Sequence, residues 1–308
     1  MTSIEKAIEK AAKRQEEMTV AENVVDAAME SANEFSDAET AVGKSQKTAS
    51  EAVRDRAHKI IDQRTGTHIA KIDIRRLHAL GMLTPDGGES SIAEEFRRIK
   101  RPLLNNAFGT SALLVESGNL IMITSAIPNE GKTFVSISLA VSIAMELDKT
   151  VLLVDTDVMK ESATKLFHTE TELGLVDAIV DPNVSLGDVI LPTDVPKLGL
   201  LPAGRLRGKA TELLASDRMR HIAEELATRY DDRVVLFDSP PLLATSEAGV
   251  LAGLVGQIVM VVESEKTTQR QMTDALATLN ADKPIGLLLN KSKTTGGSGY
   301  YYGYYGDK

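Results

Sequence analysis

The sequence Ser125-Ala-Ile-Pro-Asn-Glu-Gly-Lys-Thr133 sets the architecture expected for this chain. It follows the apolar run 120–124, which has the length of a β-strand, and it opens a pattern over 132–147 that predicts a helix. A loop in this position that ends in Gly-Lys-Thr is typical of a P-loop. In such a loop the backbone N–H groups surround a phosphate, Lys132 reaches the β- and γ-phosphates, and the Thr133 hydroxyl can ligate magnesium.

The P-loop belongs to a series of alternating strand and helix patterns between about residues 90 and 291. Strands are predicted at 120–124, 151–155, 234–238, 257–262 and 284–290, and helices at 132–147 and 209–229. Continuous apolar strands separated by helices indicate a parallel sheet covered on both faces. The expected fold class is therefore α/β, a doubly wound and mainly parallel sheet whose ligands lie at the carboxyl ends of the strands.

Two of these strands end in aspartates. Asp155 and Asp157 close the run 151–154, and Asp238 closes the run 234–237. One aspartate at a strand end is usually a cap or turn residue. Three of them at two strand ends beside a P-loop indicate a magnesium site, even though Ala126 replaces the usual first glycine of the loop motif.

The composition excludes several kinds of chemistry. The chain has 308 residues, a formal net charge of −9 and no cysteine, which excludes disulfides, thiolate catalysis and cysteine-based zinc sites. An acidic chain is a poor nonspecific ligand of nucleic acid. No apolar run approaches the roughly 20 residues that a membrane span needs, so we expect a cytoplasmic chain that is recruited to a membrane only through a partner.

The composition also divides the chain into three parts. Residues 1–88 predict a helical or disordered extension, which is either a plain linker or a docking helix. Residues 89–293 hold the P-loop domain. Residues 294–308 contain five glycines and no aliphatic side chain, which predicts a flexible tail. This tail, whose alternative interpretation is an adhesive low-complexity segment, holds five of the six tyrosines: Tyr300, Tyr301, Tyr302, Tyr304 and Tyr305.

Three motifs and the tyrosine-rich tail together resemble the bacterial tyrosine kinase family. The motifs are Ala126-Ile-Pro-Asn-Glu-Gly-Lys-Thr133, Val151-Leu-Leu-Val-Asp-Thr-Asp157 and Val234-Val-Leu-Phe-Asp-Ser-Pro-Pro241. The segments 3–10, 77–85 and 95–102 are similar to those of the tyrosine autokinases that accompany exosortase-linked exopolysaccharide loci. The resemblance covers about residues 90–308.

The resemblance implies a role for each motif position, with ATP and Mg²⁺ as cofactors. Lys132, Asp155 and Asp157 are the expected catalytic residues, and Asp157 accepts the tyrosine proton. Thr133, Asp155 and Asp238 are the expected metal ligands. Asn290 is similar to the adenine contact of related ATPases, with a strand cap as the alternative. The loop residues expected to contact the nucleotide are Pro128, Asn129, Glu130, Gly131, Lys132, Thr133 and Phe134.

The resemblance also implies partners. Glu94, Arg97 and Lys100 match a helix motif used for ring-like self-association, and the alternative is an ordinary charged helix face. The implied activator is an inner-membrane polysaccharide chain-length determinant, and a tyrosine phosphatase is expected. The implied function is autophosphorylation of the tail tyrosines in the control of exopolysaccharide export. A partitioning-type ATPase switch is the alternative, but that class carries a lysine where Ile127 stands here.

Overall fold

The computed structural model describes six stretches of the chain: residues 69–88, 90–109, 115–169, 172–204, 210–279 and 282–292. The predicted extension up to residue 68 and the tyrosine-rich tail therefore lie outside the described residues.

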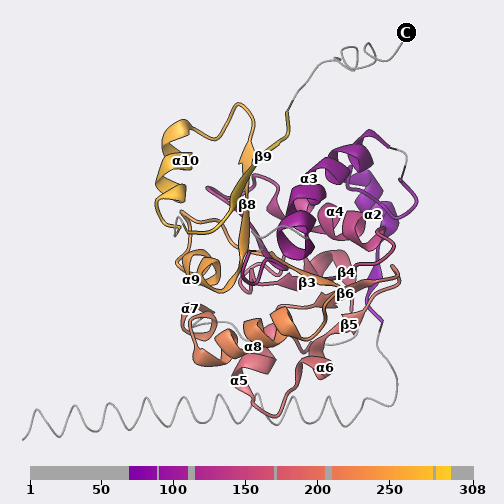
Figure 1. The fold of residues 1–308 in the computed structure, drawn as a ribbon, viewed down its shortest axis with the longest axis vertical. Coiled ribbons are helices and arrows are strands. Elements are labelled where there is room, and N and C mark those ends of the chain that lie inside the picture. The colour runs from indigo at the N-terminus through magenta and orange to yellow at the C-terminus, as the bar shows by residue number, and fades with distance from the viewer. Residues whose placement is uncertain are drawn as a thin grey trace, which may run out of the picture. The chain divides into compact units, whose positions relative to one another are not determined.

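A seven-stranded sheet lies at the centre of the domain, in the order β5–β6–β3–β7–β2–β8–β9 (Figure 1). All of its pairings are parallel except that of β5 with β6. Every residue of β2 is buried, as expected for a strand covered on both faces. The predicted doubly wound, mainly parallel fold is confirmed. The strands are β2 (Leu120–Ser125), β3 (Thr150–Asp155), β5 (Leu191–Pro192), β6 (Leu198–Leu201), β7 (Arg233–Asp238), β8 (Gln257–Glu263) and β9 (Ile285–Asn290).

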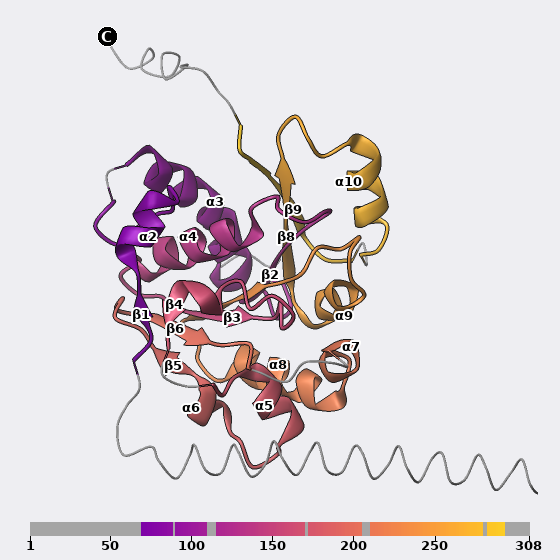
Figure 2. The same cartoon turned by 180° about the vertical axis from the view of Figure 1, so that it is seen from behind.

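Helices cover both faces of this sheet (Figures 1 and 2). α3 (Ser91–Phe108) and α4 (Lys132–Ala144) pack on the face that carries Ile121 and Ile123. α4 lies between α3 and the sheet, so 11 of its 13 residues are buried. The other face, which carries Leu120 and Met122, is covered by α5 (Leu175–Val180), α6 (Leu186–Val189), α7 (Ala210–Leu214), α8 (Asp217–Thr228), α9 (Glu247–Leu254) and α10 (Gln269–Leu276).

Two predicted helices differ from the structure. The helix predicted over 132–147 ends at Ala144, where Met145 is its C-cap. The helix predicted over 209–229 is broken into α7 and α8. Ser216 causes this break, because its hydroxyl accepts the Met219 N–H at 3.2 Å and so begins a new helix.

The packed domain begins earlier than the boundary predicted between residues 88 and 89. A two-residue strand β1 (Lys71–Ile72) pairs with β4 (Phe167–His168), next to the 3₁₀ turn η1 (Thr164–Leu166), and is followed by α2 (Ile74–Ala79). Leu77 and Leu83 are each 1% exposed in the core below α4. The sequence before residue 89 is mostly polar, so its few apolar side chains do not predict a core segment. Their burial becomes apparent only from the tertiary packing. None of the described helices is long and apolar enough to cross a membrane.

Candidate active site

The P-loop connects β2 to α4 and has the backbone that phosphate binding requires. Gly131 has a φ of 98° and Asn129 a φ of 69°, and the helix begins at Lys132. A Cβ atom on Gly131 would lie 2.1 Å from Asn290 Nδ2, so a side chain there would displace Asn290 and strain the left-handed backbone. The loop N–H groups and the positive end of α4 thus face the same space, which suits an anion.

Glu130 holds the P-loop from behind. Its side chain is fully buried, and its Oε2 accepts the Ile127 N–H at 2.7 Å. Its Oε1 accepts the Glu263 N–H at 3.3 Å and the Thr267 hydroxyl, which joins the loop to the end of β8. Glu130 was predicted to contact the nucleotide, and its side chain instead faces the protein, so that its backbone N–H is the group left to meet phosphate. Pro128 has no N–H to offer.

The end of β9 contacts the same loop. Asn290 Nδ2 donates to the Glu130 carbonyl at 2.8 Å, and Lys291 Nζ donates to the Asn129 carbonyl at 2.7 Å. Lys291 is also 3.1 Å from the Glu263 carboxylate. The last described residues of the chain, Lys291 and Ser292, therefore lie beside the phosphate site. The adenine contact expected of Asn290 stays a prediction.

Asp155 and Asp238 face each other at the ends of the paired strands β3 and β7. Asp238 accepts the Thr133 hydroxyl at 2.8 Å on Oδ2 and the Ser136 hydroxyl at 2.9 Å on Oδ1. Asp155 Oδ2 accepts both the N–H and the hydroxyl of Thr164, each at 2.8 Å. The structure thus brings together all three residues predicted as metal ligands.

The electrostatics of this pair fit a cation. Burial and, to a lesser extent, the charge of the neighbouring Asp238 together raise the pKa of Asp155 to about 7, against the opposing effect of the Thr164 hydrogen bonds. Burial also raises the pKa of Asp238 to about 6, while the hydroxyls of Thr133 and Ser136 oppose that rise. No group of three or more acidic or histidine side chains gathers for a metal in the described residues. Two carboxylates and one hydroxyl suit Mg²⁺, which takes few protein ligands and completes its shell with phosphate oxygens and water.

A cavity of about 310 Å³ opens in front of the P-loop. Lys132 lies at its base and is 8% exposed; burial lowers the pKa of its ammonium, and the charges of Asp238 and Asp157 oppose that shift. Asp157 accepts the Lys160 N–H at 3.3 Å. The lining contains six of the predicted site residues, Asn129, Gly131, Lys132, Thr133, Phe134 and Asp157, together with Lys160, Ser162 and Lys291, which were not predicted.

Comparison with known proteins supports this geometry. Residues 119–281, more than half of the chain, match a family described as an AAA domain. The chain is 35% identical over 191 residues to the tyrosine-protein kinase YwqD of Bacillus subtilis, an alignment that covers 61% of this chain and 78% of YwqD. It is 32% identical over 224 residues to the putative tyrosine-protein kinase CapB of Staphylococcus aureus, covering 72% of this chain and 93% of CapB.

A solved structure agrees with these relatives. The kinase domain of the Escherichia coli tyrosine kinase ETK is similar with a TM-score of 0.61 at 29% identity, over 76% of this chain and 94% of that domain. The chain belongs to the bacterial tyrosine kinase family. It is a protein-tyrosine kinase with an ATP-binding P-loop domain, as its three motifs indicated.

The predicted interface residues of the kinase lie on α3 but do not share one environment. Glu94 is exposed and Arg97 is half-buried, and the two side chains form an ion pair at 3.0 Å. Lys100 is 4% exposed, and its ammonium donates to the Ser142 carbonyl at 2.6 Å and pairs with Glu146 at 2.6 Å. Lys100 therefore joins α3 to the end of α4 within one subunit. The ring-like assembly of the kinase stays a prediction.

Several residues of the kinase site were not found from the sequence. Ser136 lies one helical turn after Lys132, so spacing alone points it at the same edge of the sheet. Thr164 and Lys291 carry no such signal, because their neighbours Asp155 and Asn129 come from other elements. Phe134 was predicted to contact nucleotide. It lines the cavity, and the centroid of its ring is 6.3 Å from that of Phe96.

Proposed function

We propose that this kinase transfers the γ-phosphoryl group of ATP to the tyrosines of its own C-terminal tail. The observation that carries the proposal is the position of Lys291, whose ammonium contacts the P-loop carbonyl of Asn129 at 2.7 Å. The tail is thus attached at the mouth of the phosphate cavity. The acceptors are then supplied by the sequence itself, as the tyrosine cluster Tyr300, Tyr301, Tyr302, Tyr304 and Tyr305.

Each of the clustered polar residues has a role in this transfer. Lys132 holds the β- and γ-phosphates and stabilises the charge that develops on the transferred group. Thr133, Asp155 and Asp238 would hold Mg²⁺, which neutralises phosphate charge when bound. Asp157, at the border of the cavity, accepts the proton of the tyrosine hydroxyl. The buried Glu130 keeps the loop in its binding conformation.

Membership of the family supports a proposal for the wider function. We propose that the kinase controls exopolysaccharide synthesis and export, with an inner-membrane chain-length determinant as its activator and a phosphatase that resets it. Each phosphate adds about −1.5 to −2 charges to the tail. Several of them on adjacent residues repel one another, so phosphorylation is expected to weaken the predicted ring of Glu94 and Arg97. Sedimentation of phosphorylated and dephosphorylated samples tests this last step.

The test of the kinase proposal uses the full chain with Mg-ATP, with and without the cytoplasmic segment of the activator. We expect phosphotyrosine on the tail, detected by mass spectrometry. Lys132→Met is expected to abolish it, since a cation on the transferred group is worth about 10³–10⁵ in rate. Changing all five tail tyrosines to phenylalanine removes the acceptors and leaves ATP binding intact.

The sixth tyrosine supplies a matched control. Tyr230 lies after α8, is 41% exposed, and stacks with Arg233 at 3.9 Å, so Tyr230→Phe keeps its ring contact. We expect this variant to label as strongly as the unaltered chain. Label that persists in the five-phenylalanine variant contradicts transfer to the tail. ATP hydrolysis without any phosphotyrosine, in the presence of the activator, supports the partitioning-type ATPase instead.

A further inference from the structure

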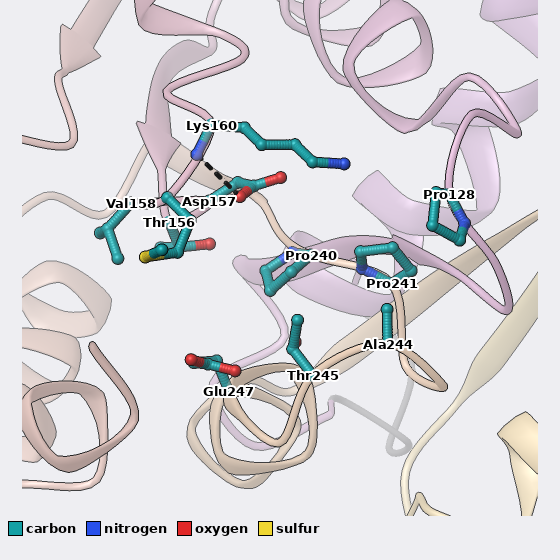
Figure 3. Close-up of a pocket in the computed structure, with 11 residues that line it drawn as sticks. Pro128, Thr156, Asp157, Val158, Lys160, Pro240, Pro241, Ala244, Thr245 and Glu247 are labelled. Carbon is teal, nitrogen blue, oxygen red and sulfur yellow. Dashed lines mark hydrogen bonds between the residues drawn. The ribbon is translucent and has the colours of Figure 1, made fainter. Parts of the chain in front are cut away.

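A second cavity of about 120 Å³ lies beside the phosphate cavity, and we call it the proline pocket (Figure 3). It lies between the segment that follows β3 and the loop between β7 and α9. In Figure 3, Asp157 and Lys160 lie on one side of Pro240 and Pro241, and Thr245 lies on the other. The lining residues are Pro128, Thr156, Asp157, Val158, Met159, Lys160, Pro240, Pro241, Ala244, Thr245 and Glu247.

The walls of the proline pocket are suited to a flat apolar group. Pro128, Pro240 and Pro241 have no backbone N–H, so these walls offer no donors to a phosphate. Val158 and Met159 add further carbon surface. A dry apolar cavity of roughly 150 Å³ takes a benzene molecule, and the proline pocket, which is open on one side, is of similar size. One aromatic ring fits it.

The polar groups of the pocket lie where a phenol needs them. Asp157 and Lys160 line both the proline pocket and the phosphate cavity, so the two cavities meet at these side chains. A ring in the proline pocket can therefore place its hydroxyl at Asp157, next to the phosphates. The hydroxyl oxygen of Thr245 is buried and has no hydrogen-bond partner among the described residues. Its unsatisfied hydrogen-bonding capacity makes it a candidate contact for an entering segment, provided that the pocket wall shifts enough to uncover it.

We propose that the proline pocket is the acceptor subsite of the kinase and binds the ring of a tail tyrosine. This inference rests on the proposed function. Tyr300 and Tyr305 lie 8 and 13 residues beyond Ser292, which permits a reach of about 26–45 Å in extended chain. Because Lys291 lines the phosphate cavity together with Asp157, the tail begins within that reach of the pocket.

The subsite explains how transfer proceeds and why tyrosine is the acceptor. The phenolic oxygen attacks the γ-phosphorus, the bond from that phosphorus to the β,γ-bridging oxygen breaks, ADP leaves with the electron pair, and Asp157 takes the phenolic proton. A tyrosine ring carries its hydroxyl across the pocket to Asp157. The hydroxyl of serine or threonine is only one bond from Cβ, so it cannot reach Asp157 in this way. The tail residues Thr294, Thr295 and Ser298 are therefore expected to stay unmodified while the tyrosines are labelled.

The test measures acceptor kinetics on the full chain with its five tail tyrosines changed to phenylalanine. The acceptor is a synthetic peptide of residues 294–308. In this background Ala244→Trp fills the proline pocket. We expect kcat/KM for the peptide to fall about 100-fold, because misplacing an acceptor by an ångström costs that much. Mg-ADP affinity and Tm should stay unchanged. The matched control is Ala277→Trp, an equally bulky change at the exposed C-cap of α10.

A second variant tests the pocket without adding bulk. Thr245→Val removes a hydroxyl that has no hydrogen-bond partner in the described part of the chain, so it should not lower stability. We expect it to raise KM for the peptide about 2- to 10-fold, the effect of one lost hydrogen bond, with kcat nearly unchanged. If Ala244→Trp prevents folding, as shown by a lost Mg-ADP stabilisation, this variant decides alone, and an unchanged KM overturns the proposal.

The remaining outcomes separate this inference from the kinase activity itself. An unaltered chain that never forms phosphotyrosine with its activator overturns the proposed function. Full activity of Ala244→Trp overturns only the acceptor subsite. If that variant sediments differently but keeps its kcat/KM, the pocket is a contact between copies of the chain. This outcome also overturns the acceptor subsite. Labelling of Ser298 at the rate of the tyrosines contradicts the proposed selectivity.

Discussion

The phosphate cavity and the proline pocket lie on two sides of Asp157 and are built differently. Around the phosphate cavity, the polar side chains are joined to one another, as in the contacts of Glu130 with Thr267 and of Thr133 with Asp238. Around the proline pocket the walls are mainly carbon, and the Thr245 hydroxyl has no partner in the described residues. The phosphate cavity is thus preorganised in the folded chain. In the proline pocket, by contrast, the proposed tyrosine ring would supply the missing contacts.

The largest expected effect comes from the residue that both cavities share. Asp157→Asn keeps the shape of the side chain but cannot take a proton, so the rate of tyrosine phosphorylation should fall about 10²- to 10⁴-fold. Mg-ADP affinity should change little, because the groups of the phosphate cavity remain in place. Quantitative mass spectrometry and nucleotide titration measure the two effects. Asp231→Asn, at an exposed position, is the control. An unchanged rate in Asp157→Asn would mean that another group takes the proton.

The next effect tests whether the phosphate cavity depends on its buried support. Glu130→Gln places an amide where three donors converge, so its NH₂ must face the N–H of Ile127 or of Glu263. A donor left unpaired in this way should lower the free energy of unfolding by about 1–3 kcal/mol. Urea unfolding measures this, together with a rise in KM for ATP. Glu224→Gln on the exposed side of α8 should have no effect, and equal losses in both variants would contradict the role of Glu130.

The sequence predicted the phosphate side well, for a physical reason. Gly131, Lys132 and Thr133 form a local motif, and Asp155 and Asp238 end parallel strands, which place their tips at one edge of the sheet. Both signals are contained in short stretches of chain.

The features that could not be predicted from the sequence depend on contacts between elements that are distant along the chain. Glu130 turns inward because it meets Thr267, which lies 137 residues away. Lys100 turns inward because α3 packs on α4 and brings Glu146 within 2.6 Å. Pro240 and Pro241 were recognised as part of a motif, but their role as walls appears only when the chain after β3 lies beside them.

The next prediction is a smaller effect, an increase in stability, and it tests the cost of the buried negative charge on Asp238. Burial raises the pKa of Asp238 from 3.8 to about 6, so the ligand-free protein loses stability as the pH rises through that range. Asp238→Asn removes this charge. The hydroxyl of Ser136 can still donate to the Lys132 carbonyl at 3.0 Å and accept from the new amide. The free energy of unfolding at pH 8 should therefore rise by about 1–3 kcal/mol.

Two further measurements separate charge from packing in this variant. Near pH 4 the gain should disappear, because the native carboxyl group of Asp238 is then protonated. Mg-ADP should stabilise Asp238→Asn less than the unaltered protein, since a metal ligand is lost. A gain of the same size at both pH values would assign the effect to packing rather than to charge.

The smallest effect concerns Asn290, which joins the phosphate cavity to the origin of the tail. Asn290→Ala removes the hydrogen bond to the Glu130 carbonyl and should cost about 0.5–1.5 kcal/mol in the free energy of unfolding. Affinities for Mg-ADP and for magnesium tripolyphosphate then distinguish the two interpretations of this residue. If Asn290 only supports the loop, both affinities fall together, because both ligands use the same N–H groups. If it also contacts adenine, the affinity for Mg-ADP falls further than that for tripolyphosphate, which has no base to recognise.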